Sequence, residues 1–216
     1  MNFDDFKGHI YLIDDDPSIR RSLTFSLSSL RYSIQSFENP AAFLRDALPI
    51  SPAVLLLDVR IPETSGLGLQ TELIRLGRTT PIIFISGESK PTEIIEAMKK
   101  GAVDFLLKPF GLHTLVSAID AALEQDKKSL RQRIKAKNAQ ERFFSLTDKE
   151  REICCWMIKG YGNKEIAALN GSAPSTVKLH RSRVLEKMGC SALSDLLDLT
   201  MDGDRRILSI IAPPRT

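Results

Sequence analysis

The stretch "IYLIDDDPSIR", Ile10–Arg20, places three consecutive aspartates directly after a run of apolar and aromatic residues. The apolar run predicts a buried strand, and Pro17, followed by leucines at helical spacing, predicts a helix after it. A carboxylate pressed against an apolar strand loses hydration, and neighbouring carboxylates repel one another. Negative charge gathered at the end of a buried strand is therefore costly unless a cation joins it.

The first half of the chain repeats this alternation of apolar runs and amphipathic stretches. Strands are predicted at 9–13, 32–37, 53–58, 81–86 and 104–108. Helices are predicted from Pro17 and near 40–48, 66–77, 91–100 and 112–125, with Gly101 in a left-handed helix end. The third and fourth strands show little polar alternation, as in parallel strands covered on both faces. We therefore expect an α/β doubly wound, five-stranded parallel sheet with its ligand site outside the carboxyl ends of the strands.

The second half is predicted to be helical. Residues 124–142 lack proline and glycine, which favours a helical linker continuing the fifth helix; a flexible charged coil is the alternative. Thr147 and Glu150 form a capping box at the start of a helix. Further helices at 163–171, 174–189 and 192–201 include two joined by a tight turn, a helix-turn-helix pattern. The expected division is 1–125, a linker at 126–142, an all-α four-helix domain at 143–203 and a tail at 204–216.

Composition and charge narrow the function further. The 216 residues are 43% hydrophobic and 26% charged, as in ordinary soluble proteins, and no apolar run is long enough to span a membrane. Residues 1–125 carry 12 basic and 16 acidic residues, a net −4, whereas residues 126–216 carry 18 and 11, a net +7. The basic half indicates a polyanion partner, with a merely solvated surface as the alternative. Three cysteines in odd number and the lack of a secretory signal favour the cytoplasm.

The predicted sheet order brings five polar residues to one edge. The first predicted strand is followed by Asp14 and Asp15. The third ends at Asp58, the fourth at Ser86 and the fifth at Lys108. Oxygen ligands without nearby histidine or cysteine favour Mg²⁺. Such a metal would leave one carboxylate oxygen to attack a phosphoryl group, while the lysine and serine contact its oxygens. Asp16 is instead a solvated residue or a helix cap.

The first half resembles the CheY-like receiver domain of two-component response regulators over roughly 8–125. The motifs are "LIDDDPSIRRSL", "LLLDVRIPETSGLGL", "IIFISGES" and "GAVDFLLKPF", in the order and spacing of that family. By this resemblance, Asp58 is the phosphoacceptor, Asp15 ligates Mg²⁺ directly and Asp14 acts through water. The backbone carbonyl of Arg60 would be a further ligand.

The same resemblance implies a switch. Ser86 and Phe105 correspond to the family's switch pair, and Lys108, before Pro109, to its phosphate-sensing lysine. Many receivers carry tyrosine where this chain has Phe105, which without a hydroxyl can signal only by packing. Taken alone, an aromatic residue in an apolar strand is usually a core residue.

The segment "LTDKEREICCWMIKGYGNKEIAAL…STVKLHRSRVLEKMG" resembles the LuxR-type four-helix DNA-binding domain over roughly 143–200. Val177, Val184 and Met188 form one apolar stripe on the helix 174–189. The other side is predicted to read the major groove, with a merely solvated face as the alternative. The candidate DNA contacts are Ser175, Thr176, Lys178, Leu179, Arg181, Ser182 and Arg183, with both arginines as phosphate clamps. Asn163 and Lys164 are expected to cap and support the preceding helix or to contact phosphate.

The turn between the two helices departs from the LuxR-type pattern. The family usually has leucine, an apolar residue and serine across this turn, where the present chain has Asn170, Ser172 and Ala173. We expect Leu169 to supply the missing apolar contact, and Ser172 to cap a helix whose first residue is Pro174.

Together the two halves resemble the FixJ/NarL-type transcriptional response regulators. This resemblance implies phosphorylation of Asp58 by a sensor histidine kinase, dimerisation, and binding of double-stranded promoter DNA, with RNA polymerase as a further candidate partner. An aspartyl phosphatase is one alternative, although such enzymes usually place a second acid where this chain has Arg60. A regulator that works without phosphorylation is the other; the chain is not expected to be an enzyme.

Overall fold

The computed structural model describes residues 6–47, 49–62 and 64–201, so the predicted tail at 204–216 lies outside the described residues. The chain divides into two compact units, Met1–Leu130 and Arg131–Thr216. Each unit has its own hydrophobic core, and each is described separately below.

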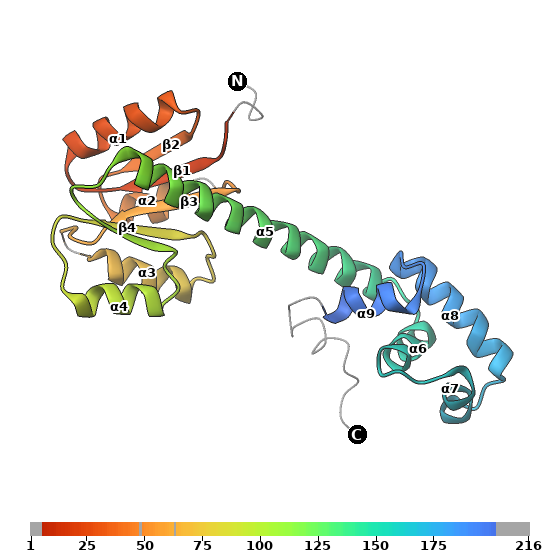
Figure 1. The fold of residues 1–216 in the computed structure, drawn as a ribbon. Helices are drawn as coiled ribbons and strands as arrows, with labels where there is room; N and C mark the ends of the chain where they lie inside the picture. The colour runs from red at the N-terminus through yellow and green to blue at the C-terminus, as the bar shows by residue number, and fades with distance from the viewer. Residues whose placement is uncertain (1–5, 48, 63, 202–216) are drawn as a thin grey trace. The chain divides into compact units, whose positions relative to one another are not determined.

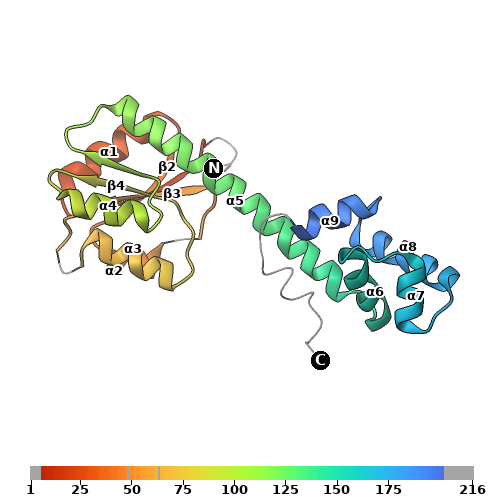
Figure 2. The ribbon, with the colours of Figure 1, turned by 60° about the horizontal axis from the view of Figure 1, so that its bottom comes forward.

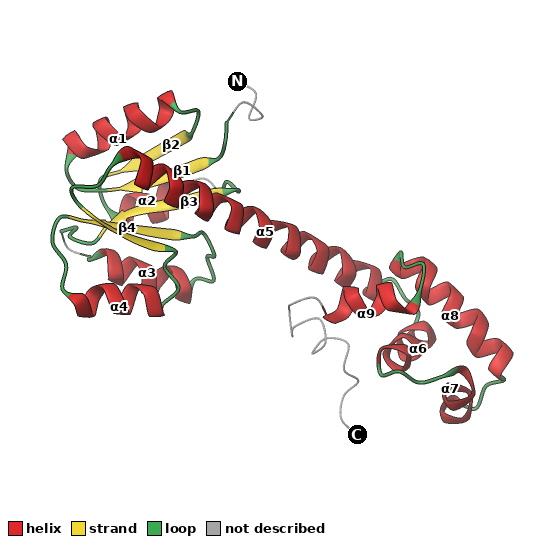
Figure 3. Cartoon of the chain, viewed as in Figure 1, coloured by secondary structure: helices red, strands yellow, loops and turns green. Residues whose placement is uncertain are grey.

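The first unit is built on a five-stranded parallel sheet (Figure 3). The strands are β1 His9–Ile13, β2 Ser33–Phe37, β3 Ala53–Asp58, β4 Ile82–Ser86 and β5 Asp104–Leu107. The helices are α1 Pro17–Ser29, α2 Pro40–Asp46, α3 Gly66–Arg75, α4 Pro91–Lys99 and α5 Leu112–Phe144. The strand order is β2-β1-β3-β4-β5, and all four pairings are parallel. The predicted doubly wound sheet is confirmed, with several ends shifted by one or two residues.

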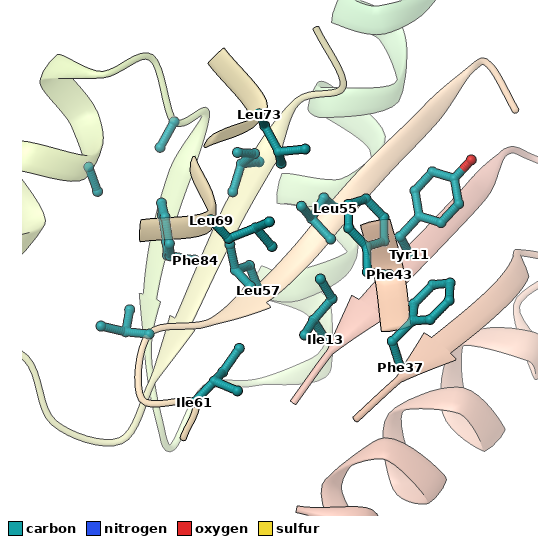
Figure 4. Close-up of a cluster of buried hydrophobic side chains, with 14 of the residues drawn as sticks. Tyr11, Ile13, Phe37, Phe43, Leu55, Leu57, Ile61, Leu69, Leu73 and Phe84 are labelled. Atoms are coloured by element: carbon teal, nitrogen blue, oxygen red, sulfur yellow. The ribbon is translucent and has the colours of Figure 1, made fainter. Parts of the chain in front are cut away.

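Alternate residues of each strand enter two separate cores on the two faces of the sheet. One core joins Tyr11, Leu55 and Phe84 to α2, α3 and α4 (Figure 4). The other joins the intervening residues, among them Leu12 and Leu56, to α1 and α5. Figure 1 shows α3 and α4 on the side of the sheet opposite α1 and α5. Because both faces are covered, β1, β3 and β4 are wholly buried, which explains why their sequences are almost entirely apolar.

Local sequence signals determine the helix ends of this unit. Asp16 is the N-cap of α1, and its side chain accepts a hydrogen bond from the backbone N–H of Ser18 at 2.7 Å. This confirms the helix-cap interpretation of that residue. Gly101 follows the end of α4 with φ +89°, a left-handed conformation that glycine adopts without strain.

Helix α5 begins in the first unit and ends in the second. Leu115 and Ile119 are fully buried against the sheet. Asp126 lies about one helical turn after Leu123 and is also buried. Its carboxylate accepts hydrogen bonds from the Ser51 hydroxyl (2.5 Å) and the Ala53 backbone N–H (3.0 Å). Residues 126–142 are helical throughout.

The second unit is helical (Figure 2). It contains the end of α5 and the helices α6 Asp148–Ile158, α7 Asn163–Asn170, α8 Pro174–Met188 and α9 Leu193–Met201. Its core includes Cys154, Val177 and Val184, all fully buried. Thr147 and Glu150 form the predicted capping box at the start of α6. Throughout the parts of the chain that the structure describes, no helix combines the length and apolar character that crossing a membrane requires.

Three expectations for the helix-turn-helix region were wrong. Ala173, not Ser172, is the N-cap of α8, because the residue before Pro174 must be extended and has φ −72°, ψ 144°. Gly162, not Asn163, is the N-cap of α7, and its N–H donates to Glu165 Oε2 at 2.7 Å. The capping role of Asn163 is therefore contradicted, while its contact with phosphate stays a prediction.

Leu169 is 53% exposed and does not replace the missing apolar contact. The buried face of α7 carries Ile166 and Ala167 instead, and Leu169 points away from the middle of that face. In the turn, the Asn170 side chain accepts a hydrogen bond from the Ser172 N–H at 3.1 Å, so polar contacts replace the expected apolar one.

Candidate functional site

Three acids gather where β1 and β3 end. Asp14 follows β1, and Asp58 is the last residue of β3, which pairs with β1 in parallel. One carboxylate oxygen each from Asp14, Asp15 and Asp58 lies within 4.8 Å of the others. Asp14 and Asp58 are 1% and 8% exposed, whereas Asp15 faces solvent. The predicted convergence of these three residues is therefore confirmed.

Lys108 supplies the positive charge that this cluster needs. It follows β5, and its Nζ lies 3.0 Å from Asp14 Oδ2 and 3.1 Å from Asp58 Oδ2. Burial lowers the pKa of Lys108, but its hydrogen bonds to Asp14 and Asp58 outweigh burial, so that the pKa is raised overall. The lysine is thus a charged bridge between the two buried acids.

Backbone groups bind the remaining oxygens of the two buried acids. The Asp16 N–H donates to Asp14 Oδ1 at 2.9 Å, and the Arg60 N–H donates to Asp58 Oδ1 at 3.0 Å. Burial raises the pKa of Asp14, and the hydrogen bonds from Lys108 and Asp16 offset this only in part. The site therefore holds negative charge in a partly dehydrated position, which makes it receptive to a cation.

Gly66 allows the chain to pass close behind Asp58. A Cβ at this position would lie 2.3 Å from the backbone oxygen of Asp58, closer than any van der Waals contact. The Gly66 N–H donates to the Val59 carbonyl at 3.1 Å. Glycine is therefore required here for steric reasons, and the position helps to hold the loop after β3.

Ser86 and Phe105 lie on the two neighbouring strands. Ser86 is fully buried; its hydroxyl donates to the Glu88 carbonyl and accepts from the Ser89 hydroxyl, both at 2.8 Å. Phe105 is half-buried and stacks on Phe84 with ring centroids 5.8 Å apart. The Ser86 hydroxyl is thus occupied by its own loop, and Phe105 packs on the core.

Two contributors to the site were missed in the sequence. Ser89 orients the Ser86 hydroxyl, and Arg20 donates from one guanidinium nitrogen to the carbonyls of Asp14 (2.7 Å) and Asp15 (3.0 Å). The position of Arg20 in the first turn of α1, directly after the three aspartates, is the signal that could have found it.

The donor set fits a hard divalent cation. Asp14, Asp15 and Asp58 offer carboxylate oxygens, which Mg²⁺ prefers. Within residues 6–47, 49–62 and 64–201, these three form the one group of acids, histidines or cysteines that could hold a metal. The buried charges of Asp14 and Asp58 are matched by a single lysine, and this is the observation that supports a second cation.

A second candidate surface lies on α8. Val177, Val184 and Met188 are buried in the core, which turns the opposite side of the helix outward. The exposed residues of this side are Ser175, Thr176, Lys178, Leu179, Ser182 and Arg183. The predicted apolar stripe is confirmed, and the exposed side is short, polar and cationic.

The other candidate DNA contacts differ in their surroundings. Arg181 is half-buried, and one of its guanidinium nitrogens donates to the Tyr161 carbonyl at 2.9 Å, which ties α8 to the loop before α7. Lys164 is exposed in the first turn of α7, and Asn163 is half-buried at its first position.

A doubly wound sheet with acids at its carboxyl edge, joined to a helix-turn-helix unit, defines the class of transcriptional response regulators. Residues 10–120 match the response regulator receiver domain, and residues 144–200 match the bacterial regulatory proteins of the luxR family. The chain belongs to this family of receiver proteins with a LuxR-type DNA-binding domain.

Curated relatives cover nearly the whole chain. Nodulation protein W of Bradyrhizobium diazoefficiens is 38% identical over 90% of this chain and 86% of its own length. Transcriptional regulatory protein FixJ of the same organism is 37% identical over 90% and 95%. Among solved structures, response regulator StyR superposes with a TM-score of 0.78 at 32% identity, covering 90% of this chain and 98% of its own.

Proposed function

We propose that the protein is switched by phosphorylation of Asp58 and then binds promoter DNA through α8. The observation that carries the proposal is the Lys108 bridge between the buried carboxylates of Asp14 and Asp58. A buried acid, held at one oxygen by a backbone N–H and at the other by a lysine, is oriented for attack on phosphorus.

In the proposed reaction, a carboxylate oxygen of Asp58 attacks the phosphorus of a phosphohistidine on a sensor kinase. The new O–P bond forms as the P–N bond breaks, and the imidazole leaves. Asp14, Asp15, Asp58 and the Arg60 carbonyl would hold Mg²⁺, which supplies neutralising charge at the phosphoryl oxygens. Lys108 then pairs with the phosphoryl group, and Ser86 releases the Glu88 carbonyl to donate a hydrogen bond to it.

The added charge is proposed to act at a distance through packing. Phe105 turns inward as Ser86 moves, and the face formed by α4, β5 and α5 is rearranged. That face pairs two receivers, and the resulting homodimer reads two half-sites about one helical turn apart. The exposed side of α8 contacts the DNA through Ser175, Thr176, Lys178, Leu179, Ser182 and Arg183. The DNA phosphates are contacted by Arg181, Asn163 and Lys164.

In this proposal the receiver comprises 1–125, the linker 126–142 and the DNA-binding domain 143–203. The partners are a sensor histidine kinase and double-stranded DNA, with RNA polymerase as a further candidate, and the protein acts in the cytoplasm. The basic charge of the second half supports a DNA partner.

The test is phosphotransfer to the full-length protein. Incubation with acetyl phosphate and Mg²⁺ is expected to add one phosphoryl mass to the wild type and none to Asp58→Asn. The asparagine keeps the side-chain shape but lacks the nucleophilic carboxylate. Binding to a target promoter, measured by fluorescence anisotropy, is expected to tighten on phosphorylation in the wild type alone.

Other outcomes would identify the two alternatives. Steady turnover of a phosphate ester would indicate a phosphatase. Equal DNA binding by the wild type and Asp58→Asn, after a confirmed mass shift of the wild type, would indicate a regulator that works without phosphorylation. The variant Asp46→Asn is a matched control, since that exposed acid pairs with Arg45 on α2 and lies outside the cluster.

A further inference from the structure

An ion pair connects the loop after β3 to the beginning of α4. Arg60 Nη2 lies 2.9 Å from Glu93 Oε2, across 33 positions of sequence. The same Glu93 oxygen accepts the backbone N–H of Lys90, the N-cap of α4, at 2.8 Å. The arginine therefore binds the carboxylate that also organises the first turn of this helix.

Helix α4 is weakly packed, and this ion pair is one of the contacts that hold its first turn. Within α4, which the structure describes in full, Ala97 is the one buried residue, while Ile95 and Met98 are 52% and 43% exposed. The later part of the helix is tied to α3: the buried Gln70 side chain donates to the Ala97 carbonyl at 3.0 Å. Lys100, at the end of α4, donates to the Thr71 hydroxyl at 2.9 Å.

Arg60 also contacts the acid cluster. Its backbone N–H donates to Asp58 Oδ1 at 3.0 Å, while its side chain reaches Glu93. One residue thus touches the proposed phosphoacceptor with its backbone and α4 with its guanidinium group. A change at Asp58 therefore acts on the backbone of the residue whose side chain binds Glu93.

We propose that the Arg60–Glu93 pair is a latch on α4 that phosphorylation of Asp58 opens; this inference rests on the proposed function. A phosphoryl group carries nearly two negative charges and three strong acceptor oxygens. Arginine therefore binds a phosphoryl group more strongly than it binds a single carboxylate. The guanidinium group then leaves Glu93 for the phosphoryl oxygens. The first turn of α4 loses its tie to the β3–α3 loop, and the helix becomes free to move.

The exposure of the pair suits a reversible latch. The side chains of Arg60 and Glu93 are 55% and 19% exposed, and ion pairs with an exposed partner contribute little stability. The equilibrium between the closed and open latch is therefore easily shifted by one new charge nearby. Removing either partner is expected to change the opening of α4 by up to about fivefold.

The first experiment measures amide hydrogen exchange of α4 in the unphosphorylated, full-length protein. Arg60→Ala is expected to accelerate exchange of the hydrogen-bonded amides of this first turn, those of Lys90, Glu93 and Ile94, by up to about fivefold. Glu93→Gln keeps an acceptor for the Lys90 N–H but removes the charge, and should show the same acceleration. The double variant should match each single variant, because both remove one interaction.

The matched control is Arg75→Ala, which breaks an exposed ion pair with Glu72 on α3, outside the proposed latch. It should leave α4 exchange unchanged. Exchange in Arg60→Ala equal to the wild type, or effects of the two single variants that add in the double variant, would overturn the inference.

The second experiment repeats the measurement after acetyl phosphate and Mg²⁺. Phosphorylation should accelerate exchange of the Lys90, Glu93 and Ile94 amides in the wild type and have a smaller effect in Glu93→Gln, where the latch is already open. An equal acceleration in both proteins would overturn the latch. Absence of a phosphoryl mass shift in the wild type would instead contradict the proposed function, leaving the first experiment to decide whether Arg60 holds α4.

Discussion

The two units of this protein use charge in opposite ways. In the first, the candidate functional acids Asp14 and Asp58 are buried and share the Lys108 ammonium group. In the second, the candidate DNA contacts such as Lys178 lie on the solvent side of α8, over an apolar core. The difference teaches that stability and function depend on the same side chains in the receiver and on separate ones in the DNA-binding unit.

Two buried carboxylates make the comparison concrete. Burial raises the pKa of Asp14 despite Lys108, whereas hydrogen bonds from Lys187 and Thr147 lower the pKa of Glu150 to about 2. Ionised Asp14 therefore costs the folded state stability as pH rises, and ionised Glu150 adds stability above its ordinary pKa. The charge of the first acid opposes folding, whereas the charge of the second stabilises the fold.

The largest expected effect tests the buried cluster. Lys108→Met should lower the unfolding free energy of the first unit by about 2–3 kcal/mol in EDTA, because two buried acids lose their cation. The loss of stability is measured by urea unfolding, with hydrogen exchange of the β1 and β3 amides as the readout. A second change, Asp58→Asn, should restore part of the loss by removing one of the two repelling charges.

Lys100→Met is the matched control for that experiment. Lys100 pairs with Glu96 on the surface at 2.7 Å, so its loss should cost less than about 1 kcal/mol. If both lysine variants were equally stable, the buried cluster would not depend on its cation and the comparison between the units would fail.

An intermediate effect is expected at Glu150. Glu150→Gln should reduce the stability of the second unit by about 1–2 kcal/mol at pH 7, because the charged hydrogen bond to Lys187 at 2.7 Å is lost. Since the folded-state pKa is depressed, this advantage is present above pH 4.5 and is lost as pH falls toward 2. The fluorescence of Trp156, the single tryptophan, reports unfolding of this unit.

The exposed acid Glu152 provides the control for pH dependence. It pairs with Lys149 on the surface of α6, so Glu152→Gln should follow the wild type within about 0.5 kcal/mol at every pH. A Glu150 variant whose difference from the wild type persisted unchanged at pH 2 would show that charge is not the source of its effect.

The smallest effect on stability is expected at the DNA-binding surface. Lys178→Ala should leave unfolding of the second unit unchanged within about 0.5 kcal/mol, yet weaken binding to duplex DNA roughly tenfold. The slope of log affinity against log salt concentration should become less steep by about one unit, because one phosphate contact is lost. Anisotropy titrations at several salt concentrations measure this slope. Lys149→Ala removes the same charge from α6 and should have little effect on DNA binding. An equal loss of affinity in Lys149→Ala would show that α8 binds DNA only as part of a generally basic surface.

Much of the fold could be predicted from local patterns. Unbroken apolar runs gave the buried strands, and capping residues such as Asp16 and Thr147 marked helix starts, because these signals act within a few residues. The gathering of Asp14 and Asp58 followed from parallel strand order. The cap of α8 and the contact expected of Leu169 were wrong, because proline geometry and the direction of a buried face outweighed residue type.

The sequence by itself determined which segments form strands and helices and which acids meet, since hydrophobic periodicity and chain direction are written in it. Only the tertiary structure decided which charges pair: Lys108 with Asp14, Arg60 with Glu93 and Lys187 with Glu150. The physical reason is that an ion pair between distant positions depends on distances of a few ångströms, and these are set by the packing of whole elements.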